Sequence, residues 1–249
     1  MKIMEAKSLM RNYLVNSGQN KATEVPVIKG LDMEVEKEEM LAIMGRSGSG
    51  KTTLLKVLGC IDSPSGGQLF YEGRNVKGFT RDERADMRRT KMGFVFQDFN
   101  LMPGLSVREN IMIPMILDGQ EVEEMKKKAQ DLAVQFGISH QLDKKTYEIS
   151  GGEKQRVAIC RSLVNDPEII LADEPTGNLD SASSEIVMEA LESINNKLQK
   201  TILIVTHDAD VARRCKRVIF LKDGQIYADI RKKDGQNFLD AIIEKQREM

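Results

Sequence analysis

The sequence has few of the residues that build cross-linked or metal-centred proteins. Of its 249 residues only three are cysteines, Cys60, Cys160 and Cys215, and only two are histidines, His140 and His207. The cysteines lie far apart, without the spacing of a disulfide framework or a zinc site. We therefore expect three reduced thiols, as in a reducing compartment. His140 lies in a polar stretch and is expected at the surface.

An excess of charge of one sign is also missing. Charged residues make up 30% of the chain, yet the formal net charge is only −1. The composition therefore predicts no basic surface for nucleic acid. The chain also has no internal repeat or low-complexity segment, and its length suffices for one large α/β domain or one domain with an insertion.

Long hydrophobic runs are absent. The longest, residues 111–117, is far shorter than the roughly 20 residues that cross a bilayer as a helix, and it contains Pro114. The first ten residues carry Lys2, Glu5 and Lys7 without a long apolar core, so we expect no signal peptide. These patterns predict a protein that is soluble by itself and reaches a membrane only through a partner.

What the sequence does have is a glycine-rich segment, residues 45–53, that matches the phosphate-binding pattern G-x-x-x-x-G-K-[ST]. The segment follows an apolar run at 40–44 and precedes a helical run at 54–58, the order that the motif requires. Its glycines let successive N–H groups converge on a polyphosphate, and the following helix adds its positive dipole end. The alternative is a glycine-rich turn that caps an ordinary helix, but the motif with both flanks is rare by chance.

The residue types in this segment predict a bound nucleotide. Lys51 is expected to bring a positive charge to the β and γ phosphates, and the hydroxyl of Thr52 to bind Mg²⁺. Thr53 is the weaker candidate for a ligand. The residues expected to contact the nucleotide are Gly45, Arg46, Ser47, Gly48, Ser49, Gly50, Lys51, Thr52 and Thr53.

Two apolar runs predict strands that end in polar residues. The run at 168–172 is typical of a strand buried on both faces of a parallel sheet, and Asp173 and Glu174 follow it at the carboxyl end, where ligands bind in open α/β sheets. The run at 201–205 predicts a second strand, which brings His207 to the same edge. In one interpretation, Asp173 and Glu174 only cap the loop that follows. Beside a phosphate loop, a Mg²⁺ carboxylate and a base for the attacking water are the better interpretation.

At three further positions the residues alone do not decide between a structural and a functional role. Tyr13 lies just before a polar loop, where it either stacks on an adenine ring or simply packs. Gln97 follows a strand, which is usually unremarkable. Ser150, followed by Gly151 and Gly152, begins a helix either as an ordinary N-cap or as a second anion cradle.

Between residues 98 and 150 the pattern changes from strands to helices. Ser106 and Glu109 have the spacing of a capping box, and apolar residues between 122 and 136 recur at helical intervals. Crossover helices of an α/β sheet are one interpretation. A stretch of about fifty residues without a strand favours an inserted helical subdomain, which offers a docking surface.

The two ends of the chain have patterns of their own. Residues 2–9 and 25–37 predict strands, and Asp223 with Gly224 predicts a hairpin turn. The tail predicts an amphipathic helix that folds against its own domain or meets a partner, with packing favoured.

The order of several motifs along the chain resembles that in the nucleotide-binding subunit of an ATP-binding cassette (ABC) transporter. The match covers nearly the whole chain. The motifs are the phosphate loop, Gln97, residues 149–153, residues 169–174, residues 178–180 and His207. The resemblance implies an α/β fold of the P-loop NTPase type, with a mostly parallel sheet, an N-terminal antiparallel β region and an inserted helical subdomain. It implies a single domain, residues 1–249, whose parts are a core at 1–97 and 157–232, a helical subdomain at 98–156 and a C-terminal helix at 233–249.

The resemblance also implies a head-to-tail dimer that encloses two ATP molecules with Mg²⁺. In that family the phosphate loop of one subunit faces a signature segment of the other, which is here Ser150, Gly151, Gly152 and Glu153. Short cytoplasmic helices of a transmembrane permease subunit enter a groove near residues 98–105. The protein is then expected at the cytoplasmic side of the cell membrane, peripheral through its permease.

The family also implies a role for each remaining position. Glu174 would be the catalytic base, Asp173 and Gln97 would serve the metal and its water, and His207 would contact the γ-phosphate. Asp180 would lie in the loop that communicates across the dimer interface. Tyr13 would stack on adenine.

Two residues depart from the commonest signature, Leu-Ser-Gly-Gly-Gln. Ile149 and Glu153 replace its first and fifth residues, but the Ser-Gly-Gly core is intact, so we expect function to survive. The segments 59–62, 94–101 and 172–180 are similar to the branch of macrolide exporters, lipoprotein-release systems and peptide-antibiotic detoxification transporters. The ending, at 220–227 and 238–240, is most similar to the peptide-antibiotic group.

Three other functions are alternatives to an exporter. A cassette ATPase acting on DNA or the ribosome typically has long coiled coils or a second cassette, and the chain has neither. A GTP switch needs Asn-Lys-x-Asp, and the nearest match, residues 196–199, lacks the final acid. An ATPase that drives a mechanical or signalling change in its permease is not separable from an exporter by this sequence.

Overall fold

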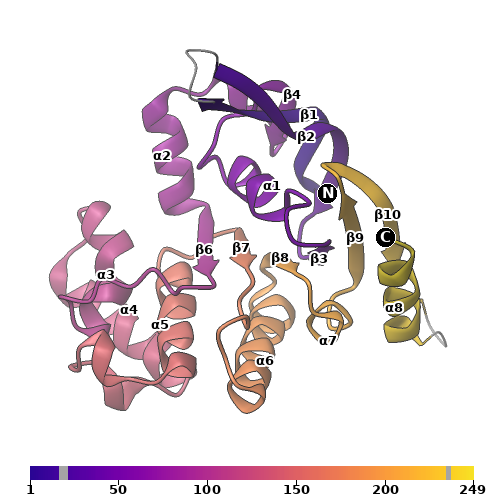
Figure 1. Ribbon diagram of the computed structural model, residues 1–249. Helices are drawn as coiled ribbons and strands as arrows, with labels where there is room; N and C mark the ends of the chain where they lie inside the picture. The colour runs from indigo at the N-terminus through magenta and orange to yellow at the C-terminus, as the bar shows by residue number, and fades with distance from the viewer. Residues whose placement is uncertain (17–21, 234–236) are drawn as a thin grey trace. The chain divides into compact units, whose positions relative to one another are not determined.

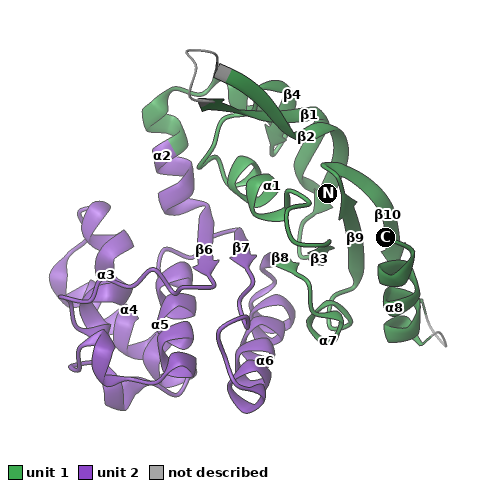
Figure 2. Ribbon diagram, viewed as in Figure 1, with its two compact units in different colours: residues 1–84, 203–249 green, residues 85–202 purple. Residues whose placement is uncertain are grey.

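The computed structural model describes residues 1–16, 22–233 and 237–249 (Figure 1). The chain divides into two compact units (Figure 2). Unit 1 comprises residues 1–84 and 203–249, and unit 2 comprises residues 85–202. Of the polar loop expected after Tyr13, residues 17–21 lie outside the described residues, and strand β2 begins at Ala22.

The first part of unit 1 is an antiparallel sheet in the order β2-β1-β4-β5. Its strands are β1 (Lys2–Asn16), β2 (Ala22–Glu36), β4 (Gly66–Tyr71) and β5 (Arg74–Asn75). The sequence predicted a first strand at 2–9, which is too short. Strand β1 continues beside β2 as a long ribbon, in which Tyr13 pairs with Val25. Tyr13 therefore lies within a strand rather than at its end.

The second part of unit 1 has the strand order β10-β9-β3-β8. Strand β3 (Met40–Met44) is buried throughout and leads to helix α1 (Lys51–Leu58). It pairs in parallel with β9 (Arg217–Lys222), which turns into the antiparallel β10 (Gln225–Arg231). Strand β8 (Thr201–Thr206) begins in unit 2 and continues in unit 1.

Short elements complete unit 1. The hairpin turn predicted at Asp223 and Gly224 is confirmed, with φ values of 49° and 82°. A 3-10 turn, η1 (Val76–Gly78), follows β5, and helix α7 (Ala209–Ala212) follows β8. Helix α8 (Phe238–Glu248) packs against α7 and β9, as expected for a tail that folds on its own domain.

Unit 2 combines a parallel strand pair with helices. Strands β6 (Met92–Phe96) and β7 (Ile169–Asp173) pair in parallel. The helices are α2 (Arg81–Thr90), which begins in unit 1, α3 (Val107–Leu117), α4 (Val122–Gln135), α5 (Gly151–Leu163) and α6 (Ser181–Leu198), with 3-10 turns η2 (Ser139–Gln141) and η3 (Thr146–Glu148). Between residues 98 and 150 the chain forms helices and one isolated bridge but no strand, as predicted.

The capping box predicted before α3 is confirmed. Ser106 Oγ accepts a hydrogen bond from the N–H of Glu109 at 3.2 Å, and the N–H of Ser106 donates to Glu109 Oε2 at 2.6 Å. Such a reciprocal pair satisfies two of the helix's unpaired N–H groups and fixes where it begins. Apolar side chains of α3 and α5, among them Ile111 and Ile159, are fully buried.

Two expectations from composition hold for the described residues. All three cysteines are buried and none forms a disulfide, and His140 is exposed. Within residues 1–16, 22–233 and 237–249, no helix has the length and apolar character needed to cross a bilayer.

Candidate functional site

The segment between β3 and α1 has the backbone of a phosphate-binding loop. Gly48 and Gly50 adopt φ values of +79° and +102°, which only glycine takes without strain. Gly45 has a different constraint, since a Cβ there would lie 2.4 Å from the carbonyl oxygen of Leu221 and 2.5 Å from Ser49 Oγ. The loop's shape therefore depends on all three glycines.

Helix α1 begins at the end of this loop without a side-chain cap. Its N-cap is Gly50, and no acidic residue lies in its first turn. The first N–H groups are therefore directed at the loop, where the helix dipole favours an anion.

Lys51 and Ser49 make the loop suited to a polyphosphate. The ammonium of Lys51 donates to the carbonyl oxygens of Gly45 at 2.8 Å and Arg46 at 3.1 Å, so its charge is held at the loop. Ser49 Oγ is buried and has no hydrogen-bond partner among the described residues. A cationic group, an orphaned hydroxyl and uncapped N–H groups together fit phosphate oxygens.

The turn of the β9-β10 hairpin is hydrogen-bonded to the phosphate loop. The N–H of Gly224 donates to the carbonyl oxygen of Ser49 at 3.2 Å, and the N–H of Lys29 donates to that of Gly224 at 3.0 Å. A Cβ at Gly224 would lie 2.2 Å from the carbonyl oxygen of Val27. The phosphate loop is thus tied to a turn about 175 residues further along the chain.

Tyr13 is fixed on two sides within unit 1. Its hydroxyl donates to Asp62 Oδ2 at 2.6 Å, and the guanidinium of Arg11 lies 4.4 Å from the centre of its ring. Arg11 also lies 3.6 Å from the same carboxylate oxygen. This arrangement sets the ring's orientation and covers one face with a cation.

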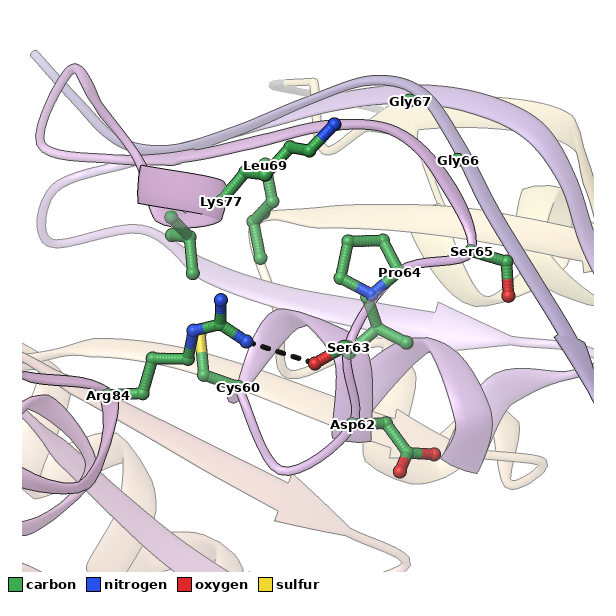
Figure 3. Close-up of a pocket in the computed structure, with 12 residues that line it drawn as sticks. Cys60, Asp62, Ser63, Pro64, Ser65, Gly66, Gly67, Leu69, Lys77 and Arg84 are labelled. Carbon is green, nitrogen blue, oxygen red and sulfur yellow. Dashed lines mark hydrogen bonds between the residues drawn. The ribbon is translucent and has the colours of Figure 1, made fainter. Parts of the chain in front are cut away.

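A cavity of about 180 Å³ lies beside Asp62 (Figure 3). It is bounded by the turn that follows α1, by the start of β4, by η1 and by α2. Arg84 closes one side and donates to Ser63 Oγ at 3.0 Å. None of the residues that line the cavity belongs to the phosphate loop. Of Tyr13, Arg11 and Asp62, only Asp62 lines it.

His207 follows β8 at the point where the strand ends, as predicted, and is exposed. The N–H of Asp208 donates to Thr206 Oγ1 at 3.0 Å, and the carboxylate of Asp208 accepts from the N–H of Asp210 at 2.7 Å. The side chain of Gln246, on α8, donates to the carbonyl oxygen of His207 at 3.2 Å. The backbone on both sides of the imidazole is therefore held.

Asp173 and Glu174 lie at the carboxyl end of β7 in unit 2, as the sequence predicted. Both side chains are half-buried, and Glu174 adopts a φ of +46°. Residues other than glycine rarely occupy this left-handed region, and strain of this kind gathers at functional sites. The N–H of Gly177 donates to the carbonyl oxygen of Glu174 at 3.0 Å, which closes the turn that aims the side chain.

Gln97 lies against the loop that follows Glu174. Its amide donates to Asn178 Oδ1 at 3.2 Å, and Asn178 Nδ2 donates both to the carbonyl oxygen of Gln97 at 3.1 Å and to Asp98 Oδ1 at 2.9 Å. A Cβ at Gly177 would come within 2.9 Å of Gln97 Nε2. Gln97 is thus part of a network within unit 2 rather than a free residue at a strand end.

Ser150 caps α5 through a second capping box. Ser150 Oγ accepts from the N–H of Glu153 at 3.3 Å, and the N–H of Ser150 donates to Glu153 Oε2 at 2.8 Å. Gln141 Nε2 donates to the other carboxylate oxygen of Glu153 at 2.5 Å. Burial alone raises the pKa of Glu153, but the hydrogen bonds from Ser150 and Gln141 outweigh it and lower that pKa overall.

The glycines of this segment also have neighbours in unit 2. A Cβ at Gly152 would lie 2.7 Å from Ser183 Oγ, and one at Gly151 would lie 3.5 Å from a methyl group of Leu179. Gly152 therefore permits close packing between α5 and the start of α6.

Asp180 caps α6, accepting from the N–H and hydroxyl of Ser183 at 2.9 and 2.7 Å. These bonds lower the pKa of Asp180.

One buried residue of unit 2 was missed by the sequence analysis. Gln155 is fully buried and donates to the carbonyl oxygen of Pro175 at 2.7 Å, which joins α5 to the turn after Glu174. Its Oε1 has no partner among the described residues. The only sequence signal was a long polar side chain on the mostly apolar inner side of α5.

The predicted residues divide between the units. Unit 1 contains the phosphate loop, Tyr13 and His207. Unit 2 contains Gln97, Asp173, Glu174, the segment from Ser150 to Glu153, and Asp180. Among the residues that the structure describes, no cluster of three or more His, Cys, Asp or Glu side chains forms a metal site by itself. Mg²⁺ typically binds through one or two protein ligands plus substrate phosphates, and the donor types of Thr52, Asp173 and Gln97 fit that chemistry.

Comparisons with known proteins agree with this geometry. Residues 28–177 match the family model described as ABC transporter. The chain is 42% identical over 248 residues to the bacitracin export ATP-binding protein BceA of Halalkalibacterium halodurans, covering 99% of this chain and 96% of that protein. It is also 42% identical over 230 residues to the macrolide export ATP-binding/permease protein MacB of Campylobacter jejuni, covering 92% of this chain and 35% of MacB.

A solved structure has the same fold. It is the dimeric structure of a post-hydrolysis state of the ATP-binding cassette MJ0796 bound to ADP and Pi. The TM-score is 0.84 at 36% sequence identity, covering 92% of this chain and 99% of that one.

Proposed function

Because the chain belongs to the ABC transporter ATPase family, we propose that it is the ATP-hydrolysing subunit that powers a membrane permease, and that two copies enclose two ATP molecules head to tail. The phosphate loop carries this proposal. Its glycines allow a backbone shape that residues with a Cβ would not take without strain or a clash, and its lysine, orphaned serine hydroxyl and uncapped helix suit a triphosphate.

Within one copy, each group has a proposed task. Lys51 and the N–H groups of α1 bind the β and γ phosphates, and Tyr13 stacks on the adenine. Glu174 orients and polarises the attacking water, and His207 contacts the γ-phosphate. Thr52, Asp173 and Gln97 would hold Mg²⁺, which neutralises phosphate charge when bound.

The second copy completes the site in this proposal. Ser150 and Gly151 lie at the N-terminus of α5, an end that favours negative charge. The capping box already satisfies part of that end, so the remaining N–H groups and the dipole are what a phosphate would meet. Phosphoryl transfer needs little covalent chemistry, so placing charges on both sides of the phosphates provides most of the catalysis.

The branch and partner are proposed from the relatives. BceA is named for bacitracin export and MacB for macrolide export, and MacB joins an ATP-binding part and a permease in one protein. We therefore assign the chain to this antibiotic-resistance and lipoprotein-release branch, with a separate permease that keeps it at the cytoplasmic side of the membrane. Purification with its membrane partner, followed by identification of that partner, tests this assignment.

The substitution Glu174→Gln tests the composite site. It removes the proposed base and preserves the shape of the side chain, so ATP is expected to bind while turnover falls by at least about 100-fold. Size-exclusion chromatography with Mg-ATP should then show an ATP-bound dimer. Glu124→Gln, on the exposed surface of α4, is the matched control and should behave as the unaltered protein. A Glu174→Gln variant that remains a monomer with Mg-ATP contradicts the proposal.

A further inference from the structure

The C-terminal helix α8 is attached to the segment that carries His207. Gln246 Nε2 donates to the carbonyl oxygen of His207 at 3.2 Å, across 39 residues of sequence. Both residues belong to unit 1, in which Figure 1 shows α8 beside α7 and β10. The bond is therefore a tertiary contact between the tail of the chain and a proposed catalytic residue.

Helix α8 is itself firmly placed. Phe238, Ile242 and Met249 are at most 7% exposed, so one side of the helix is packed into unit 1. At its last turn Glu248 accepts a hydrogen bond from the hydroxyl of Tyr227, on β10, at 3.1 Å. A helix anchored near both ends keeps the Gln246 side chain within hydrogen-bonding distance of the His207 carbonyl oxygen.

The bond acts on the backbone that orients the imidazole. The carbonyl oxygen of His207 marks the plane of the peptide that joins it to Asp208, and the orientation of that plane sets ψ of His207. Two local bonds hold the flanking residues, one from the N–H of Asp208 to Thr206 Oγ1 and one from the N–H of Asp210 to the Asp208 carboxylate. Gln246 adds the long-range restraint.

We infer that Gln246 is a positioning residue for His207, through which helix α8 sets the rate of ATP turnover. The inference rests on the proposed role of His207 at the γ-phosphate. In this inference Gln246 acts through the backbone of His207 and not by contact with the nucleotide. It keeps the imidazole in the orientation that the reaction uses, and a displacement of α8 reaches the reaction through this bond.

The first test compares substitutions on adjacent residues of α8 in the full chain. Gln246→Ala removes the donor, and Gln246→Glu keeps the size but offers only acceptors, so each should lower kcat about fivefold, the effect of one neutral hydrogen bond. Affinity for ADP should stay within about twofold, because the phosphate loop and Tyr13 are untouched. Lys245→Ala removes the neighbouring Lys245–Glu248 pair instead and should leave kcat unchanged. Equal losses in the Lys245 and Gln246 variants overturn the inference in favour of helix packing.

A double-mutant cycle with His207→Ala separates this inference from the proposed function. If Gln246 acts through His207, Gln246→Ala should lower kcat no further once the imidazole is gone. Additive losses overturn the inference. A slow His207→Ala variant together with unaltered rates in both Gln246 variants overturns the inference alone. An unaltered rate in His207→Ala overturns the proposed role of His207 as well.

Discussion

Gln97 and Asn178 hold each other through two hydrogen bonds across 81 residues of sequence. Gln97 Nε2 donates to Asn178 Oδ1 at 3.2 Å, and Asn178 Nδ2 donates to the carbonyl oxygen of Gln97 at 3.1 Å. The strand that ends at Phe96 and the loop that follows Glu174 are therefore coupled at their tips. A residue proposed to serve the metal is placed by the loop that carries the proposed base.

Asn178→Ala is expected to release Gln97 and slow the reaction. The two neutral hydrogen bonds with Gln97, of about 1 kcal/mol each, are lost together with the bond to Asp98. The loss of the two bonds with Gln97 corresponds to a decrease in kcat of up to about 30-fold. Affinity for ADP should change little, because the phosphate loop is not altered. Steady-state ATPase assays with Asn196→Ala, an exposed position on α6, as the control check this prediction. A wild-type kcat in Asn178→Ala contradicts it.

The sequence predicted the features of this site that depend on local pattern. The phosphate loop, the capping box at Ser106, the helix start at Ser150 and the hairpin at Gly224 follow from short-range rules about glycine, hydroxyl side chains and turns. In the structure Gly48 and Gly50 have left-handed φ values, and Ser106 and Ser150 both cap the helices that follow them.

Contacts between distant segments could not be predicted from the sequence. The bonds of Gln97 with Asn178, of Gln155 with Pro175 and of Gln246 with His207 join residues from 20 to 81 positions apart. Amide side chains have no periodic signal, and their partners are set by tertiary packing. The length of β1 was missed for a similar reason, because residues 10–15 are exposed or half-buried and gain their partners from β2, as when Asn12 donates to Glu24.

Substitutions at two loop glycines should have unequal effects. In Gly45→Ala the new Cβ would lie 2.4 Å from the backbone oxygen of Leu221, so the loop must shift and ATP binding should be lost. In Gly48→Ala the space is open and only the φ of +79° is unfavourable, at a cost of about 1–2 kcal/mol. Nucleotide titrations should therefore show no binding for Gly45→Ala and weakened binding for Gly48→Ala. Equal affinities in the two variants contradict this.

The carboxylate of Glu153 should make the stability of the chain depend on pH. Its pKa in the folded protein lies below the ordinary value, because the hydrogen bonds from Ser150 and Gln141 outweigh burial. The stabilisation is therefore present above the unfolded pKa of about 4.3 and is lost as the pH falls through the folded pKa. In thermal unfolding, Glu153→Gln should have a lower Tm than the unaltered chain at pH 7, and the difference should shrink by about pH 3. A difference that does not vary with pH argues against this role.

Arg217 provides the most demanding test of stability, because its guanidinium and the carboxylate of Glu39 are both buried. Their side chains are 5% and 6% exposed and lie 3.4 Å apart, and Arg217 also donates to Asp229 at 2.6 Å. Arg217→Ala leaves the charge of Glu39 without this partner in a buried site, which should lower the free energy of unfolding by about 3–5 kcal/mol.

Arg231 offers the matched comparison for that substitution. It lies 3.6 Å from the same carboxylate of Glu39, but its side chain is 54% exposed. Solvent screens such a pair, so Arg231→Ala should cost less than about 1 kcal/mol. Adding Glu39→Gln should recover part of the loss in Arg217→Ala, because it removes the uncompensated charge. If urea unfolding gives equal losses for the two arginine variants, or no recovery in the double variant, burial of the Arg217–Glu39 pair does not set its contribution.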